Sequence, residues 1–186
     1  ELNESLVVVT DRLQPRAVSK GQTISRQVPA AAQAWLHGDA DKLLRLFLNR
    51  VENAIKFTPQ GGEITIRVAD KEPGWLLVEV TDTGPGIPTE QMQHIFDRFY
   101  RVDTARSRAS GGTGLGLALA RWIAEAHGGH IQVRRGDPIG TVFSVRLLRF
   151  ADPPKTTHQK QMEAVIRRPL PFGPAYYFLH FSPVRL

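Results

Sequence analysis

The sequence contains no cysteine, and this absence excludes both a disulfide framework and a zinc site built from thiolates. It also has no run of about 18 apolar residues, the length that a bilayer-spanning helix needs. The chain opens on acidic and polar residues, Glu1 to Glu4, rather than on a secretory signal. We therefore expect a soluble chain in a reducing compartment, the cytoplasm. This leaves open whether a longer parent protein is anchored in the inner membrane.

What is present suffices for one folded domain. Of the 186 residues, 41% are hydrophobic and 23% are charged, which is ordinary for a globular protein. The net charge of +6 fits a nucleic acid, a membrane surface or an anionic small ligand as partner, or simply a solvated basic surface. Residues 151–186 are rich in proline and show no sustained period. We expect a domain over residues 1–150 and a poorly ordered extension after it.

Hydrophobic spacing, with glycine and proline as breaks, predicts both helices and strands. We expect helices over Leu6–Lys20 (interrupted by Pro15), Asp41–Phe57, Thr89–Val102 and Gly114–Ala126, and extended segments at Thr23–Val28, Gln33–His37, Ile64–Val68, Leu76–Val80, His130–Arg134 and Thr141–Leu147. The helix over Asp41–Phe57 has the clearest pattern, because its apolar residues recur at spacings of three and four.

The expected helix over Asp41–Phe57 also has a distinctive polar face. Asn49, Asn53 and Lys56 stand at positions i, i+4 and i+7, so their side chains stack on one side. An amide oxygen suits Mg²⁺, and an ammonium group neutralises phosphate charge. The alternative is that these three residues are only the solvated side of an amphipathic helix.

A carboxylate, Asp82, follows the expected strand Leu76–Val80. By the period of two, Asp82 shares the buried face of Val78 and Val80, where a charge is costly unless a donor meets it. A purine amine would be such a donor, and Gly84 and Gly86 would let the backbone approach a flat ligand. An ordinary Asp-Gly turn at the end of a strand is the alternative interpretation.

A glycine-rich run, Gly111 to Leu117, opens the last expected helix after the Ser/Arg/Gly segment Thr104–Gly112, which resembles a mobile loop. The free N–H groups of a helix N-terminus favour phosphate. The run lacks the lysine of a P-loop and does not follow a first strand as a Rossmann fingerprint does, so both of those interpretations are excluded.

Taken together and in this order, the motifs resemble the histidine-kinase branch of the ATPase superfamily that includes gyrase, MutL and the ninety-kilodalton heat-shock chaperones. The resemblance covers about Leu2 to Leu148. Its motifs are Asn49 to Thr58 (N box), Asp82 to Gly86 (first glycine box), Phe96 to Tyr100 (F box), Gly112 to Leu117 (second glycine box) and Gly140 to Phe143 (closing strand). Pattern and resemblance together predict an α/β two-layer sandwich, a mixed sheet of about five strands with three helices on one face.

The resemblance implies ATP and Mg²⁺ as cofactors, with a role for each matching residue. Asn53 and Asn49 would hold Mg²⁺, and Lys56 and Arg101 would meet the phosphates. Asp82 would accept from the adenine amine, with Thr141 supporting it. The other residues expected at the nucleotide are Phe57, Gly84, Gly86, Ile87, Tyr100, Gly112, Thr113, Gly114, Leu115, Gly116 and Leu117. Residues Thr104 to Gly112 would form the ATP lid.

Asn49 separates a kinase from the water-splitting relatives, which usually carry a glutamate at this place. A neutral carboxamide cannot take a proton from water at neutral pH, and Glu52 lies on a different side of the helix. We therefore expect phosphoryl transfer rather than hydrolysis. The alternatives are an ATPase or conformational switch module, a degenerate domain that binds nucleotide as a scaffold, and a nucleic-acid role resting on the charge alone.

The phosphate-accepting histidine of the family lies in a helical motif that this sequence does not contain. None of its histidines has that context: His37, His94, His127, His130, His158 and His180. The expected partners are therefore a separate histidine-bearing dimerisation domain and a response regulator, within a homodimeric parent. No contact of this chain with nucleic acid or membrane is expected.

Overall fold

The structure, a computed structural model, describes residues 1–28, 35–102 and 113–150. Its strands form one sheet in the order β1-β2-β3-β5-β4. The sheet is mixed, because β1 runs parallel to β2 while the other neighbours are antiparallel. The elements are α1 (Leu2–Ser19), β1 (Thr23–Gln27), α2 (Ala40–Phe57), β2 (Glu63–Glu72), β3 (Trp75–Asp82), the 3₁₀ helix η1 (Thr89–Gln91), α4 (Gly116–Ala126), β4 (His130–Arg135) and β5 (Thr141–Leu148).

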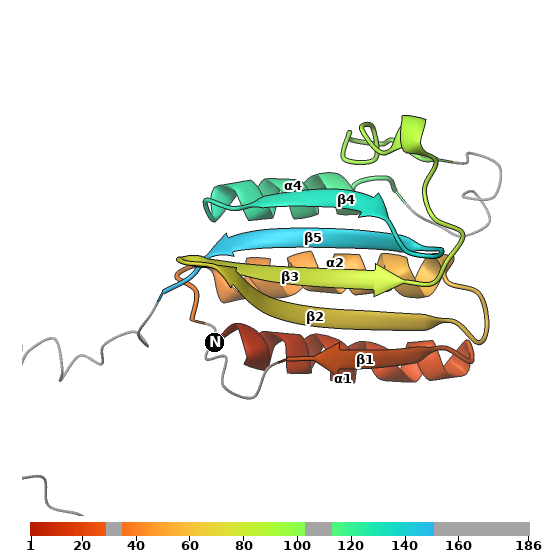
Figure 1. The fold of residues 1–186 in the computed structure, drawn as a ribbon, viewed down its shortest axis with the longest axis horizontal. Coiled ribbons are helices and arrows are strands. Elements are labelled where there is room, and N and C mark those ends of the chain that lie inside the picture. Colours follow the sequence, from red (N-terminus) through yellow and green to blue (C-terminus); the bar gives the residue numbers. More distant parts are fainter. Residues whose placement is uncertain (29–34, 103–112, 151–186) are drawn as a thin grey trace, which may run out of the picture. The chain divides into compact units, whose positions relative to one another are not determined.

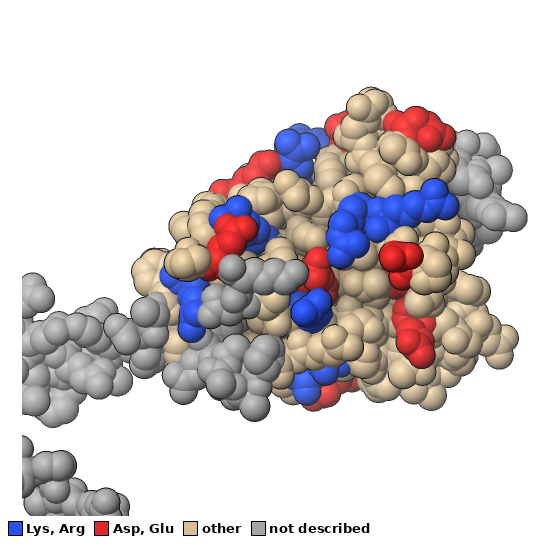
Figure 2. All heavy atoms as spheres, viewed as in Figure 1, with Lys and Arg blue, Asp and Glu red and all other residues tan. Residues whose placement is uncertain are grey.

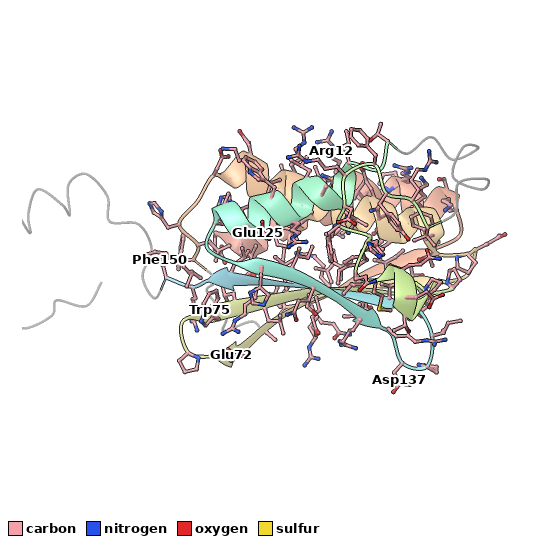
Figure 3. The ribbon with its side chains drawn as sticks, turned by 90° about the horizontal axis from the view of Figure 1, so that it is seen from above. Arg12, Glu72, Trp75, Glu125, Asp137 and Phe150 are labelled. Atoms are coloured by element: carbon pink, nitrogen blue, oxygen red, sulfur yellow. The ribbon has the colours of Figure 1, made fainter. Side chains whose placement is uncertain are left out.

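The domain has two layers. Helices α1, α2 and α4 lie side by side on one face of the sheet, as Figures 1 and 3 show. This arrangement confirms the predicted two-layer sandwich of a mixed five-stranded sheet and three helices. None of the helices in the described ranges is long and apolar enough to cross a membrane.

Helix α2 lies at the centre of the helical layer. The Asp39 carboxylate caps its first turn by accepting the Lys42 N–H at 3.1 Å. Its apolar stripe packs on the sheet, with Phe47, Val51 and Ile55 fully buried. The opposite side of the helix is therefore left for polar residues.

Among the described residues, no helix covers the outer face of the sheet, and this face carries charges of both signs (Figure 2). Arg134 on β4 donates to Glu79 on β3 at 3.2 Å, across the intervening strand β5. Arg146 pairs with Glu72. Arg146 also stacks on the ring of Trp75, with 4.3 Å between its guanidinium carbon and the ring centroid. Such alternation differs from the single-sign stripe that binds nucleic acid.

One predicted helix is wrong. Over Thr89–Val102 the structure has only η1 followed by turns, and N–H groups bond three residues back, as from His94 to Gln91 and from Asp97 to His94. Phe99 then adopts a φ of 66°, which no α-helix contains, and its N–H bonds Gly114. This tertiary contact outweighs the local preference for a helix.

Two smaller predictions about element bounds also differ from the structure. Helix α1 begins at Leu2 and runs through Pro15 without ending there. In the run Gln33–His37, residues 33 and 34 lie outside the described residues, and Trp35 makes only an isolated bridge to Phe150. The expected loop Thr104–Gly112 and the extension 151–186 also lie outside the described ranges.

Arg50 is a charged residue in the core that the sequence pattern does not reveal. Its side chain on α2 is 1% exposed, and burial lowers its pKa to about 9. Its guanidinium carbon lies 4.7 Å above the Phe143 ring, and Nη2 reaches the Asn49 carbonyl at 3.5 Å. Nε and Nη1 have no hydrogen-bond partner within the described part of the chain. A cation buried this way lowers the stability of the fold.

Replacing Arg50 with methionine should therefore raise the free energy of unfolding by roughly 1–3 kcal/mol, since an apolar side chain of similar length removes the desolvation cost. Chemical denaturation of wild type and Arg50→Met measures this. Arg45→Met, at an exposed position of α2, should stay within about 0.5 kcal/mol of wild type. A loss of stability in Arg50→Met would mean that the contact with Phe143 outweighs desolvation.

Candidate functional site

The predicted site residues lie on α2, β3, β5 and α4 and in the connections beside these elements. Asn49, Asn53, Lys56 and Phe57 occupy the second half of α2, Asp82 ends β3, and Thr141 begins β5 beside it. Gly84, Gly86 and Ile87 follow β3, and Tyr100 and Arg101 follow the turns after η1. Thr113 to Leu115 precede α4, and Gly116 and Leu117 are its first two residues. Gly112 lies outside the described residues.

Asp82 is the buried acid of the site. It is 6% exposed, and its carboxylate accepts the Gly84 N–H at 2.9 Å. The Thr141 N–H and hydroxyl also donate to it. Burial nevertheless raises the pKa of Asp82, because these donors offset only part of the lost hydration. The period-two prediction of a buried carboxylate is confirmed, and such a group is suited to accept a hydrogen bond from a ligand.

Backbone packs closely around this carboxylate because glycine permits it. A Cβ at Gly84 would lie 2.9 Å from Asp82 Oδ1 and 3.1 Å from the Phe57 carbonyl oxygen. A Cβ at Gly140 would lie 1.8 Å from the Asp82 carbonyl oxygen, and its φ of +102° also favours glycine. The ends of α2, β3 and β5 thus meet at Asp82 without side chains between them.

The polar face of α2 lies beside the start of α4. A Cβ at Gly116 would be 3.3 Å from Asn49 Oδ1, so the two elements touch there. Asn53 is half-buried one turn further along α2. Glu52 instead points toward α1, with 3.9 Å between its Oε1 and the Nη1 of Arg16. The predicted separation of Glu52 from the two asparagines is therefore confirmed.

Lys56 has two other cationic side chains, Arg101 and Arg16, in its electrostatic surroundings. Burial is the main reason that its pKa is lowered, and the charges of Arg101 and Arg16 lower it further. Arg101 is half-buried, and its Nη2 has no hydrogen-bond partner among the described residues. The Lys56 ammonium and the Arg101 guanidinium, whose Nη2 has no partner among the described residues, would together attract an anion. The residues present therefore fit a phosphate-bearing ligand.

The F box and the second glycine box meet at one backbone contact. The Phe99 N–H donates to the Gly114 carbonyl at 3.1 Å, and a Cβ at Gly114 would lie 2.8 Å from Phe99 Cα. Gly114 has a φ of +72°, so glycine is required here for space and for conformation. Helix α4 starts at Gly116, two residues later than predicted. Thr113 and Leu115 are exposed.

The remaining predicted residues surround these groups. Ile87, Tyr100 and Leu117 are partly buried and pack against the core. The Tyr100 ring lies 5.6 Å from the His94 ring, centroid to centroid. Phe57 is 55% exposed, and the Lys56 ammonium lies 5.2 Å from its ring centroid. Its backbone, rather than its ring, approaches Gly84.

Sequence reasoning missed the part of Gly140 in this site. Its position before Thr141 in the closing motif was the available signal, but its contact with Asp82 depends on the pairing of β3 with β5. Tertiary packing alone brings these residues together.

A family model described as histidine kinase-, DNA gyrase B-, and HSP90-like ATPase matches residues 38–151. Because the match covers more than half of the chain, the chain belongs to this family. The motifs at the ends of α2 and β3 and before α4 all lie within this range.

Similarity to individual proteins supports the same family. The sensor histidine kinase RppB of Synechocystis is 36% identical over 152 residues, which cover 82% of this chain and 33% of RppB. The mycobacterial sensor histidine kinase MprB superposes with a TM-score of 0.72 at 31% identity, covering 80% of this chain and 95% of that one. Full-length ShkA in complex with AMPPNP gives 0.70 at 29% identity, with 83% and 32% covered. The chain thus spans about a third of RppB, with the fold of a histidine kinase catalytic domain.

The raised pKa of Asp82 predicts a pH dependence of stability. Because the folded state favours the protonated carboxyl, its contribution is fully present below the unfolded value of 3.8 and is lost as pH rises through the folded value. We expect wild type to lose stability relative to Asp82→Asn as pH rises above about 4. Urea denaturation of both proteins across this range measures the difference, and Asp11→Asn, at an exposed position of α1, is the control. A pH-independent difference contradicts the prediction.

Proposed function

We propose that this chain is the ATP-binding catalytic domain of a sensor histidine kinase. It binds Mg-ATP and directs the γ-phosphoryl group to a histidine on a dimerisation domain, from which a response-regulator aspartate receives it. The observation that carries this proposal is the buried Asp82 carboxylate, at the same end of the fold as the Lys56–Arg101 pair. An acceptor for the base and cations for the phosphates thus occur in one site.

The base-binding half of the site centres on Asp82. Its carboxylate accepts the exocyclic amine of adenine, while Thr141 and Gly84 hold it in place through their donated hydrogen bonds. Gly84 and Gly86 leave room for the flat ring. A base without a donor at this position would leave the buried carboxylate short of one bond.

The phosphate-binding half lies across α2 and the start of α4. Lys56 and Arg101 neutralise the phosphate charge, and the free N–H groups that open α4 at Gly116 add to the positive potential. Asn49 and Asn53 offer amide oxygens to Mg²⁺. The bound nucleotide supplies the transferable phosphoryl group, and these residues orient it and stabilise its charge.

The choice of kinase over ATPase rests on Asn49. Its carboxamide cannot act as a general base, and Glu52 faces Arg16 on another side of α2. An imidazole nucleophile needs no such base, because its neutral nitrogen carries a lone pair. The dimerisation domain of the whole protein would contribute that imidazole. The whole protein would act as a homodimer, either in the cytoplasm or anchored in the inner membrane.

Lys56→Met should weaken binding of AMPPNP with Mg²⁺ by about tenfold to a hundredfold, since charge-assisted bonds contribute about 1.5–3 kcal/mol each. Calorimetric titration of the full chain measures this. Arg45→Met removes a charge from an exposed position of the same helix and should leave the affinity within about twofold, because exposed charges interact weakly. Equal losses in the two variants would argue against a phosphate site at Lys56.

A steady-state ATPase assay on the wild-type chain discriminates the two classes of function. Slow turnover is expected without a histidine-bearing partner, and phosphorylation should appear when such a domain is added. Robust turnover by the isolated chain would favour the ATPase or switch module instead.

A further inference from the structure

The C-terminal end of α2 is held by side chains from the turn between α1 and β1. An α-helix leaves its last carbonyl groups without partners inside the helix, and these need donors from elsewhere. On α2 the last intrahelical bond of this kind runs from the Thr58 N–H to the Ala54 carbonyl at 2.9 Å. The carbonyls of Ile55, Lys56 and Thr58 then accept from outside the helix.

Gln22 supplies two of these donors. Its side-chain Nε2 donates to the Ile55 carbonyl at 3.0 Å and also to the Thr58 carbonyl. Both partners are carbonyl oxygens, so the amide must present its NH₂ group to them. Gln22 is 4% exposed, and water therefore cannot replace these bonds easily.

Lys20 adds a cation to the same carbonyls. Its ammonium donates to the Ile55 carbonyl and lies 3.4 Å from the Lys56 carbonyl. A positive charge at a helix C-terminus is also favourable for the helix dipole. Lys20 itself is exposed, so its contribution is expected to be smaller than that of Gln22.

The segment that carries these two residues is itself fixed. The Gln22 N–H bonds the Ala17 carbonyl at 2.9 Å, and the Gly61 N–H bonds the Gly21 carbonyl at 2.8 Å. Residue Thr23 then enters β1, with its N–H on the Gly62 carbonyl at 3.1 Å. Gln22 is thus held between the end of α1 and the start of β2, and its side chain has a defined position relative to α2.

The held turn of α2 is the one that reaches the nucleotide site. Lys56 belongs to this turn, and its ammonium group lies within the electrostatic influence of Arg101, while the Phe57 carbonyl lies against Gly84 beside Asp82. A shift of this turn would displace the ammonium group and the wall of the base pocket together. We propose that Gln22, assisted by Lys20, is a positioning residue that fixes Lys56 for phosphate binding, an inference that rests on the proposed function of the site.

Gln22→Met keeps the length of the side chain and removes both donors. We expect it to weaken AMPPNP–Mg²⁺ binding by the full chain on the order of three- to thirtyfold. Gln27→Met makes the same change at an exposed position at the end of β1 and should leave the affinity unchanged. Unchanged affinity in Gln22→Met would overturn the proposal.

A double-mutant cycle separates positioning from a general loss of stability. If Gln22 acts through Lys56, Gln22→Met should weaken binding far less in a Lys56→Met background than in wild type. Equal fold-losses in both backgrounds would overturn the proposal, because Lys56 would then not mediate the effect. Should Gln22→Met fail to fold, Lys20→Met takes its place in the cycle, since Lys20 is exposed and its loss spares the core.

Hydrogen exchange distinguishes failure of this inference from failure of the proposed function. In Gln22→Met without nucleotide, the Thr58 amide should exchange faster than in wild type, while amides in the middle of α2 keep their rates. Wild type that binds no AMPPNP would refute the nucleotide site but leave this comparison intact. Unchanged exchange at Thr58 would refute the positioning role itself.

Discussion

The site depends on a single costly arrangement, the burial of the Asp82 carboxylate at the end of β3. Its donors come from Gly84, two residues later, and from Thr141 on the neighbouring strand. The pairing of β3 with β5 and the close approach of Gly140 are therefore conditions for the acid to be held at all. A ligand that donates a hydrogen bond to this carboxylate replaces one of the hydrogen bonds to water that the carboxylate loses on folding.

The charge distribution around Asp82 explains why one end of α2 gathers the other site residues. The C-terminal end of a helix is negative and favours cations, which Lys20 and Lys56 provide. The N-terminal end of α4 is positive and lies against Asn49. An anionic ligand between them is therefore attracted by Lys56, Arg101 and the first N–H groups of α4. Under the proposed function, the polyphosphate and the base of ATP would meet different parts of this site.

Local pattern was sufficient to predict the elements whose period is strong. The apolar stripe of α2, the alternation in β2 and β3, and the burial of Asp82 follow from spacing alone. The segment after Thr89 could not be predicted this way, because a backbone contact between Phe99 and Gly114 decides its path. Gln22 and Arg50 were missed for a similar reason, since neither has a role until α1, α2 and the sheet are packed together.

The proposed specificity of the site for adenine depends on a hydrogen bond from the exocyclic amine of adenine to the Asp82 carboxylate. Calorimetric titration of the chain with Mg²⁺ and either ATP or inosine triphosphate tests this bond, because inosine triphosphate has the same phosphates and ribose but no exocyclic amine. We expect inosine triphosphate to bind at least about tenfold more weakly than ATP, because a buried acceptor loses its donor. We also expect Asp82→Ala to abolish this difference. Equal affinity of the wild-type chain for the two nucleotides would mean that Asp82 does not recognise the adenine amine.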